Sequence, residues 1–461
     1  MVAKSTLQSI PVSQGEIVDL EIKSMAYDNS AVARYQDFII FVERGVPGDE
    51  VRAEITTLRP NYARAKIIEI KKSDQNYRIE APCKLFKVCG GCQWQNLPYE
   101  KQLEQKDFLM KQFCTKLNLE EGVLKGIIGT DDIWNYRNKV QYPVRTVEST
   151  GRLKAGYFEW HSNDLINIKY CPVQNKKFDD VVETVRELSP KYKITSKWLR
   201  HICIRVGENI GEVLLTLVAR DEKLSRSQDF ANEVMKKHPE LVGVCININT
   251  QTTNVIYGPR TITLKGRGYI FEEINNIKYK ISATSFFQIN TKQTIKMLDV
   301  IHDMLCRGAI NRAPTVLDAY CGTGLISLFL AKHAKKIIGI EEIKGSIDDA
   351  NSSAKENDIK NVTFINGKVE NKIKDVLEKE KPEVVILDPP RAGCNKRILE
   401  SILESEAKKI IYVSCNPSTL IRDLELLCAL PSHPFTIKSI QPIDMFPHTY
   451  HVECVVLLER N

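Results

Sequence analysis

The chain has 461 residues, of which 43% are hydrophobic and 27% charged, and its formal net charge is +7 at neutral pH. This length exceeds what one hydrophobic core usually supports, so we expect two or three domains. No apolar run is long enough to span a bilayer and no secretion signal is recognisable, so we expect a cytoplasmic protein without a membrane partner. The 13 cysteines then indicate metal ligation, catalysis or burial rather than disulfides.

Residues 1–71 contain five short alternating stretches, among them GEIVDLEI and ARAKIIEI, with a turn signal at Asp28-Asn29. Short strands at this spacing are typical of a small closed barrel of the oligonucleotide-binding kind. The positive net charge suits a polyanion partner, although a lysine-rich surface alone gives the same balance. We therefore predict an N-terminal β-barrel, with ligand binding as a possible role.

Three cysteines follow this region at Cys83, Cys89 and Cys92, and Cys171 precedes a proline far downstream. Four thiolates that include a Cys-x2-Cys pair can hold zinc or an iron–sulfur cluster. The uneven spacing and the Cys-Pro at the fourth position favour a 4Fe–4S cluster over zinc. Four unrelated buried thiols are the third reading of this pattern.

The rest of the chain changes character at about Thr294. A helical pattern covers residues 98–117, and the signal from residue 136 to 281 is mostly strand, as in EVLLTLVAR. We therefore predict a mixed, β-rich central domain over residues 72–281. Beyond it, apolar strands alternate with longer helical stretches, which is typical of a doubly wound parallel sheet. This pattern predicts an α/β domain over residues 282–461.

The first turn of this parallel sheet lies in the stretch TVLDAYCGTG, whose glycines let the backbone turn tightly and approach a ligand. The next strand ends at Glu341, about twenty residues on, where a carboxylate can bind ribose hydroxyls. The third glycine of the dinucleotide motif is absent, which favours an adenosyl cofactor over one with a pyrophosphate. A plain strand–helix turn is the alternative.

Three further side chains stand at later strand ends of this domain. Asp388 precedes Pro389-Pro390, and Cys415 lies between an apolar strand and a proline turn. Because ligands of open parallel sheets lie beyond the carboxyl ends of the strands, both would face a cofactor. Glu453 begins the last apolar strand, and burial there would raise its pKa toward that of a working base. The alternatives are a helix cap for Asp388, a small buried hydrophobe for Cys415 and an exposed strand start for Glu453.

Together these residues resemble the RNA uracil-5-methyltransferase family, in its branch with an N-terminal TRAM barrel and a 4Fe–4S cluster. The resemblance covers essentially the whole chain. It implies an RNA-binding TRAM barrel over residues 1–71 and an RNA-binding central domain with the cluster over residues 72–281. Residues 282–461 would then form the S-adenosylmethionine-dependent methyltransferase domain, and the stretch NYRNKVQYP at residues 135–143 looks like the family's RNA-facing segment.

The resemblance also implies roles for single residues. Cys415 would be the nucleophile and Glu453 the general base. The residues implied to contact S-adenosylmethionine are Gln288, Tyr320, Glu341 and Asp388. The implied ligands of the cluster are Cys83, Cys89, Cys92 and Cys171. We expect the cluster to be structural, because methyl transfer to uracil needs no electron.

The resemblance implies methyl transfer to carbon 5 of a specific uridine in 23S ribosomal RNA. The reaction would pass through a covalent Cys–uracil intermediate, and the chain would act as a monomer. One alternative is the same chemistry on the T-loop uridine of transfer RNA. The barrel and the cysteines count against the compact transfer-RNA relatives that lack both. A non-catalytic RNA-binding assembly factor is the other alternative, and an intact pair of Cys415 and Glu453 counts against it.

Overall fold

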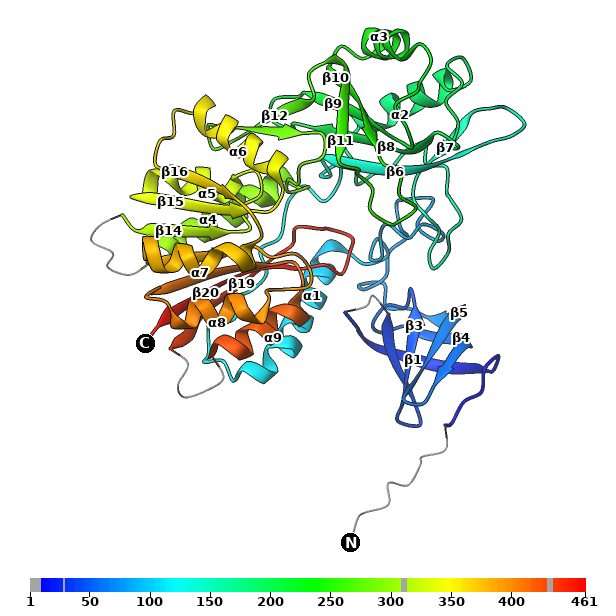
Figure 1. Ribbon diagram of the computed structural model, residues 1–461. Coiled ribbons are helices and arrows are strands. Elements are labelled where there is room, and N and C mark those ends of the chain that lie inside the picture. The colour runs from blue at the N-terminus through cyan, green and yellow to red at the C-terminus, as the bar shows by residue number, and fades with distance from the viewer. Residues whose placement is uncertain (1–9, 28–29, 308–312, 429–433) are drawn as a thin grey trace. The chain divides into compact units, whose positions relative to one another are not determined.

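Five strands near the N-terminus close into a barrel, because buried and exposed side chains alternate along them. The computed structural model describes residues 10–27, 30–307, 313–428 and 434–461. The strands are β1 (Ile17–Met25), β2 (Ala31–Tyr35), β3 (Phe38–Glu43), β4 (Glu50–Arg59) and β5 (Tyr62–Lys72). Their order is β1-β2-β3-β5-β4, and antiparallel pairing of β4 with β1 closes the barrel (Figure 1). The predicted barrel is confirmed, while the turn predicted at Asp28-Asn29 lies outside the described residues.

Small side chains fill the narrow interior of the barrel. The fully buried core includes Ala31, Ala53 and Ala63, with β-branched residues between them. At Gly45 an added Cβ would lie 2.8 Å from the Cβ of Ala31, so only glycine lets the chain pass this close. Trp94, from the segment that follows the barrel, is completely buried in the same core. The barrel therefore depends on residues beyond its own strands.

The chain divides into two compact units. Unit 1 comprises residues 1–112 and 446–451, and unit 2 comprises residues 113–445 and 452–461. The predicted helical pattern over residues 98–117 corresponds to α1 (Tyr99–Cys114) and the 3-10 helix η1 (Thr115–Leu117). The domain boundaries predicted after residues 71 and 281 stay predictions.

Unit 2 contains a central six-stranded sheet with the order β11-β10-β9-β8-β6-β7. Parallel pairing occurs between β9 and β10, and the other neighbours pair antiparallel. The sheet and its helices are β6 (Lys139–Thr146), β7 (Leu153–Ala155), α2 (Lys177–Leu188), β8 (Leu199–Val206), β9 (Val213–Ala219), α3 (Ser227–Lys237), β10 (Leu241–Ile248) and β11 (Arg260–Gly266). A hairpin of β12 (Tyr269–Ile274) and β13 (Ile277–Ser282) follows. This arrangement confirms the mixed, β-rich character expected of the middle of the chain.

The C-terminal part of unit 2 is built on a seven-stranded sheet with the order β16-β15-β14-β17-β18-β20-β19. Its first five strands run parallel, and β20 pairs antiparallel with both of its neighbours. The strands are β14 (Thr315–Ala319), β15 (Lys336–Glu341), β16 (Val362–Asn366), β17 (Val384–Leu387), β18 (Lys409–Ser414), β19 (Phe435–Ile443) and β20 (Glu453–Arg460). The strand order reverses between β14 and β17, which is where such sheets bind ligands.

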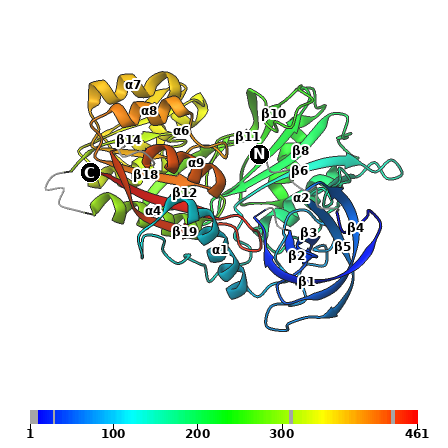
Figure 2. The same cartoon turned by 90° about the horizontal axis from the view of Figure 1, so that it is seen from below.

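Helices connect the parallel strands and complete the doubly wound fold, which is thus confirmed. They are α4 (Thr291–Cys306), α5 (Leu325–Leu330), the 3-10 helix η2 (Ala331–His333), α6 (Lys344–Glu356), α7 (Val369–Glu380), α8 (Lys396–Glu404) and α9 (Pro417–Cys428). Figures 1 and 2 show α7 and α8 side by side along this sheet. Among the described residues, no helix combines the length and apolarity needed to cross a membrane.

Candidate active site

The predicted nucleophile and base lie beside each other at one edge of the seven-stranded sheet. Cys415 follows directly on β18, and Glu453 is the first residue of β20. The antiparallel register pairs Ser414 with Cys454, so Cys415 and Glu453 are the next residues outward on the two strands. Glu453 is only 3% exposed, so the reading of Glu453 as an exposed strand start is wrong. The thiol of Cys415 is half-buried.

The charges around Cys415 act in opposite directions. Burial, together with the charges of Glu453 and Asp388, raises the pKa of the Cys415 thiol to about 11. The guanidinium of Arg391 lowers this pKa through its charge and through a side-chain hydrogen bond to the thiol. Burial, assisted by Asp388, also raises the pKa of Glu453 well above its usual value, and Arg391 opposes this shift. Arg391 is therefore the cation that favours the ionised forms of both groups.

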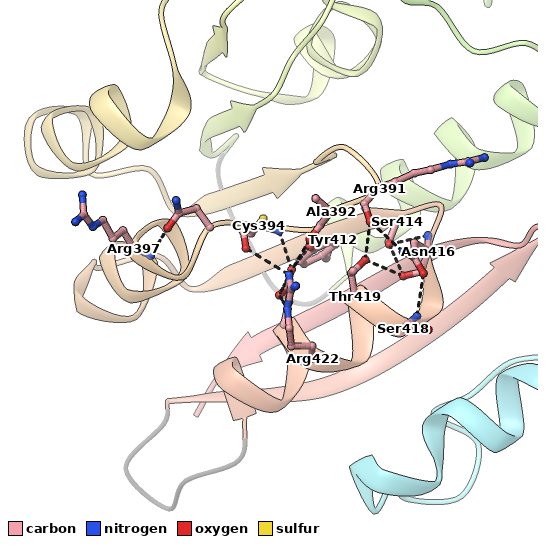
Figure 3. Close-up of polar contacts among 12 residues, drawn as sticks. Arg391, Ala392, Cys394, Arg397, Tyr412, Ser414, Asn416, Ser418, Thr419 and Arg422 are labelled. Atoms are coloured by element: carbon pink, nitrogen blue, oxygen red, sulfur yellow. Dashed lines mark hydrogen bonds and ion pairs between the residues drawn. The ribbon is translucent and has the colours of Figure 1, made fainter. Parts of the chain in front are cut away.

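A network of hydrogen bonds holds the loop of Arg391 against the loop of Cys415 (Figure 3). The backbone oxygen of Arg391 accepts hydrogen bonds from Asn416 Nδ2 at 3.0 Å and from Thr419 Oγ1 at 3.2 Å. Farther along α9, Arg422 donates to the backbone oxygen of Ala392 at 2.9 Å. The residues after the two prolines are thus tied to the helix that follows the thiol.

Asp423 anchors this network inside the fold. Its carboxylate is 2% exposed and accepts hydrogen bonds from Tyr412 Oη at 2.6 Å and from the backbone NH of Cys394 at 2.8 Å. At Gly393, whose φ is +76°, an added Cβ would lie 2.5 Å from Arg422 Nη2 and 2.7 Å from Asp423 Oδ2. A side chain at position 393 would therefore separate the two loops.

The acids predicted to contact the cofactor lie at neighbouring strand ends. Asp388 follows β17, and its pKa is raised to about 7 by burial and by the charge of Asp318. Glu341 ends β15 and accepts hydrogen bonds from the backbone NH groups of Ile343 at 2.7 Å and Gly322 at 3.2 Å. Because the carboxyl ends of parallel strands meet at the same edge, these acids converge as predicted.

The turn after β14 provides open space for a ligand. Tyr320, with φ +72°, and Gly322, with φ +53°, both adopt left-handed backbone conformations. A Cβ added at Gly322 would lie more than 4 Å from every atom of the described residues other than its two chain neighbours. Asp318 is fully buried, and its Oδ1 has no hydrogen-bond partner among the described residues, while Oδ2 accepts from Ser327 Oγ at 2.6 Å. An unfilled acceptor beside an open glycine turn fits a ligand with hydroxyl and amine donors, such as an adenosyl cofactor.

Gln288 lies in a segment that links the six-stranded and the seven-stranded sheets of unit 2 through hydrogen bonds. Its backbone oxygen accepts a hydrogen bond from Asn138 Nδ2 at 2.9 Å, and Gln288 itself is buried. In the same segment the backbone oxygen of Ser285 accepts a hydrogen bond from Arg205, which lies on β8 of the central sheet. The Ser285 hydroxyl donates to Asp349 on α6 at 2.6 Å. The segment is thus fixed from both sides.

The four predicted metal ligands are distributed over both units. Cys83, Cys89 and Cys92 lie in unit 1, and Cys171 lies in unit 2. Burial and the nearby Cys83 raise the pKa of Cys89, and Arg44 lowers it. The backbone NH of Gly91 donates to Cys89 Sγ at 3.3 Å. A turn that directs an NH group and a guanidinium charge toward sulfur suits a thiolate ligand.

A second group of metal-binding side chain types was not predicted. Among the described residues, the one set of three whose ligand atoms all lie within 4.8 Å of one another is His302, Cys306 and His333. It includes none of the four predicted ligands. The i, i+4 spacing of His302 and Cys306 on α4 was readable in the sequence, but the approach of His333 was not.

Arg391 is the candidate functional residue that sequence reasoning did not assign. Its position directly after Asp388-Pro389-Pro390 is visible in the sequence, but that position alone does not indicate a contact with the thiol. Its influence on Cys415 and Glu453 requires two loops that are separated by more than twenty positions to meet. The available signal was a cation following an acid at a strand end.

Comparison with known proteins assigns family profiles to nearly all of the chain. The profile described as tRNA (Uracil-5-)-methyltransferase matches residues 99–461, and the TRAM domain profile matches residues 11–68. A Bacillus cereus protein described as an uncharacterized RNA methyltransferase is 36% identical over 465 residues, covering 99% of both chains. A protein of Clostridium acetobutylicum with the same description is 37% identical over 462 residues, covering 98% of both.

Among solved structures, the chain is similar to the tRNA (uracil-54, C5)-methyltransferase of Pyrococcus abyssi in complex with S-adenosyl-L-homocysteine. The TM-score is 0.75, and the match covers 95% of this chain and 99% of the other. The sequence identity is 24%, so this similarity supports the fold.

Proposed function

This chain belongs to the RNA uracil-5-methyltransferase family and is thus an RNA methyltransferase, and from this premise we propose that it methylates carbon 5 of one specific uridine through a covalent bond to Cys415. The observation that carries the proposal is the thiol of Cys415 at the end of β18, beside the buried carboxyl of Glu453. A nucleophile next to a general base is what this reaction requires.

The proposed reaction begins with transfer of the Cys415 proton to solvent. The pKa of this thiol is raised to about 11, and the guanidinium of Arg391 opposes that shift and so favours the thiolate. The thiolate adds to carbon 6 of uracil, and the electron pair of the 5,6 double bond becomes an enolate that is nucleophilic at carbon 5. Carbon 5 would then take the electrophilic methyl group that S-adenosylmethionine supplies when bound, and S-adenosylhomocysteine would leave.

Glu453 completes the cycle in this proposal. With carbon 5 methylated, its carboxylate removes the carbon-5 proton, and the returning electron pair restores the double bond as the carbon–sulfur bond breaks. The thiolate of Cys415 leaves and the enzyme is regenerated. Burial keeps the pKa of Glu453 raised, which makes it a stronger base once it is ionised.

We propose that S-adenosylmethionine lies at the strand ends of β14, β15 and β17. Glu341 would accept the ribose hydroxyls, and Tyr320 and Gln288 would bound the site. Asp388 would accept hydrogen bonds next to the reacting methyl group. The open turn at Gly322 and the unfilled acceptor of Asp318 support this assignment.

We propose a 4Fe–4S cluster held by Cys83, Cys89, Cys92 and Cys171, with a structural role. The NH donor and the arginine near Cys89 support thiolate ligation there. Zinc is the alternative occupant, and the iron and sulfide content of anaerobically purified protein distinguishes the two.

Ribosomal 23S RNA is our first candidate substrate, and the chain is expected to act on it as a monomer. Transfer RNA is the second candidate, because a protein named as a tRNA (uracil-54, C5)-methyltransferase shares the fold over 95% of this chain. A barrel-bearing fold therefore does not by itself exclude transfer RNA.

The test uses unmodified large-subunit ribosomal RNA and transfer RNA, each transcribed with 5-fluorouridine. Fluorine at carbon 5 cannot leave as a proton does, so the reaction should stop at a covalent adduct through Cys415 when S-adenosylmethionine is present. Mass spectrometry of the adduct identifies both the cysteine and the uridine. An adduct with transfer RNA alone would support the Cys415 mechanism and would show that transfer RNA, not 23S ribosomal RNA, is the substrate. No adduct with either RNA, from protein that retains its metal, would refute the thiol mechanism.

A further inference from the structure

The central sheet of unit 2 presents a row of polar side chains along β6. Lys139, Gln141 and Arg145 alternate with buried residues and so lie on one face of the strand, with the apolar ring of Pro143 between Gln141 and Arg145. At one end of the row, Lys139 Nζ lies 5.6 Å from the ring centroid of Phe286, which is 59% exposed. That end adjoins the segment that carries Gln288. The row therefore leads away from the candidate active site.

A cavity of about 540 Å³ lies at the other end of this row. Its lining includes Gln141, Arg145, Tyr157, Phe158, His201 and Arg220. A volume of about 300–1,000 Å³ is typical of pockets that hold small ligands. The cavity is therefore large enough for one nucleotide.

The charge inside the cavity is positive and unbalanced. Arg145, Arg200 and Arg220 line it, and no aspartate or glutamate is among its described lining residues. Neither Arg145 nor Arg220 forms an ion pair within the described part of the chain. The nearby acid Glu222 is paired with Arg260 at 2.8 Å. Guanidinium groups without a carboxylate partner favour an anion such as a phosphate.

One of the three arginines shapes the wall instead of facing a ligand. Arg200 donates hydrogen bonds to the backbone oxygens of Gln251 at 2.5 Å and Thr253 at 2.9 Å. These bonds fix the segment that contributes Thr252, Thr253 and Asn254 to the lining. Burial and the charges of Arg200 and Arg145 lower the pKa of His201 to about 4, so this imidazole is neutral at physiological pH. Neutral polar groups on this wall suit recognition of a base edge.

Aromatic rings form another side of the cavity. The Tyr157 hydroxyl accepts a hydrogen bond from Gln174 Nε2 at 2.6 Å, and its ring packs edge-on against Tyr142. Phe158 is 38% exposed. An exposed ring beside unpaired guanidinium groups is the usual combination for binding a base with its phosphate.

A neighbouring cavity shows the contrast. It measures about 440 Å³ and shares Arg145, but its lining also contains Glu159 and Asp164. Its cations, Arg145 and Lys154, are thus balanced by two acids. Of the two cavities, only the first has the charge that a nucleotide requires.

We propose that the first cavity binds one extruded nucleotide of the substrate RNA, different from the uridine that is methylated. Its phosphate would contact Arg145 and Arg220, and its base would stack on Phe158. From Asn138, which is bonded to the Gln288 segment, to Pro143 in the cavity wall, the chain covers about 17 Å at the usual rise of a β-strand. A few nucleotides of single-stranded RNA can bridge this distance. The inference rests on the proposed function, because it locates a second element of recognition for the same RNA.

The test compares two double variants that remove the same charge from the intact holoprotein. The cavity variant combines Arg145→Gln with Arg220→Gln and removes the two cations of the cavity that have no ion-pair partner among the described residues. The control variant combines Arg152→Gln with Lys154→Gln and removes two exposed cations nearby. For the RNA that is methylated, the cavity variant should raise KM about tenfold or more with little change in kcat. The control should change KM by less than about threefold.

A second measurement locates the nucleotide directly. Ultraviolet crosslinking of the holoprotein to unmodified transfer RNA and to a large-subunit ribosomal RNA fragment, followed by mass spectrometry, should join the peptide of Phe158 to a nucleotide other than the methylated uridine. Phe158→Ala should abolish that crosslink. Equal KM changes in the two double variants, or no crosslink at this peptide, would overturn the proposal.

The two hypotheses fail in different ways. If neither RNA is methylated but binding still depends on Arg145 and Arg220, the proposed function is wrong and the nucleotide cavity stands. If methylation is normal and the cavity variant behaves like its control, the cavity proposal is wrong and the proposed function stands.

Discussion

At the strand ends of the seven-stranded sheet the ionisable groups are mainly acids. Along β6 of the central sheet they are cations. Asp318, Asp388 and Glu453 all have raised pKa values because they are buried near one another. On the central sheet, burial and neighbouring cations lower the pKa of Lys139 to about 7. Each region thus collects ionisable groups of one sign. The pKa values of its acids rise, or those of its cations fall, toward 7.

The difference follows from what each region would bind. A cationic cofactor and a proton in transit are stabilised by carboxylates, which a parallel sheet collects at its strand ends. A polyanion is stabilised by cations spread along a surface, which the alternating face of a strand provides. In the proposed function, unit 2 would separate chemistry from RNA recognition by using two different features of β-structure. The substitutions that test this separation each remove one charge or one nucleophile from one region.

The largest effect is expected from Cys415→Ala. Removal of the thiol should abolish both methyl transfer and the 5-fluorouridine adduct, because no other described thiol lies beside Glu453 at this edge except Cys454, which is fully buried. RNA binding should be nearly unchanged, since the cations of the central sheet are intact. Methyl transfer from radiolabelled S-adenosylmethionine and RNA gel shifts measure the two. Residual turnover within tenfold of the parent would exclude Cys415 as nucleophile.

Glu453→Gln should slow turnover by about 10²–10⁴-fold, the usual contribution of a general base. Addition of the thiol is still possible, so an adduct with ordinary uridine should accumulate, which the parent enzyme does not show. Denaturing gels of enzyme and labelled RNA measure it. Glu459→Gln on the same strand, where Glu459 is paired with Lys409 at 3.7 Å, is the control and should turn over normally. Accumulation of adduct in both variants would argue against a specific role for Glu453.

Arg391→Gln should have a smaller effect, on the ionisation of Cys415. The guanidinium lowers the pKa of this thiol, so its loss should move the pKa upward from about 11. Because the thiolate is the reactive form, alkylation of Cys415 at a fixed pH below that value should become about three- to tenfold slower. The exposed thiol of Cys306 serves as the internal reference in the same sample. An unchanged ratio of the two rates would show that Arg391 does not act on the nucleophile.

The strand ends were largely predictable from sequence, and the reason is geometric. In a parallel sheet each apolar run ends at the same edge, so the residue that follows each run is placed without knowledge of any contact. Glu341, Asp388 and Cys415 were found in this way. Glu453 was found because an acid at the start of a buried strand is costly unless it is used.

The cationic cavity was not predictable, because its walls come from parts of the chain that are far apart. Arg145 follows from the period of β6, but Arg220 lies at the end of β9, and the pairing of both strands with β8 brings them together. The role of Arg391 depends in the same way on bonds between two loops. Local patterns indicate which residues lie on one edge or face, while cavities depend on long-range pairing.

The smallest expected effect concerns the pH dependence of RNA binding through Lys139. Burial lowers its pKa to about 7, with Arg205 and Arg137 acting in the same direction and Cys203 opposing them. A phosphate favours the charged amine, so RNA binding should be strongest below pH 7 and should weaken as the pH rises through the pKa of the bound state. Fluorescence anisotropy at constant ionic strength should therefore show an affinity about three- to tenfold higher at pH 6 than at pH 8.5.

Lys139→Gln should lower the affinity at pH 6 and leave it nearly unchanged at pH 8.5, which removes the slope. Two other titrating groups cannot explain a slope that disappears in Lys139→Gln. His201, with a pKa of about 4, is neutral from pH 6 to pH 8.5. Asp388, with a pKa of about 7, lies at the strand ends of the seven-stranded sheet and is still present in the variant. Lys154→Gln, an exposed cation on β7, should keep the slope. A slope that survives Lys139→Gln would mean that the charge of this lysine does not contribute to RNA binding, and that the row along β6 binds RNA through Arg145 and the cavity alone.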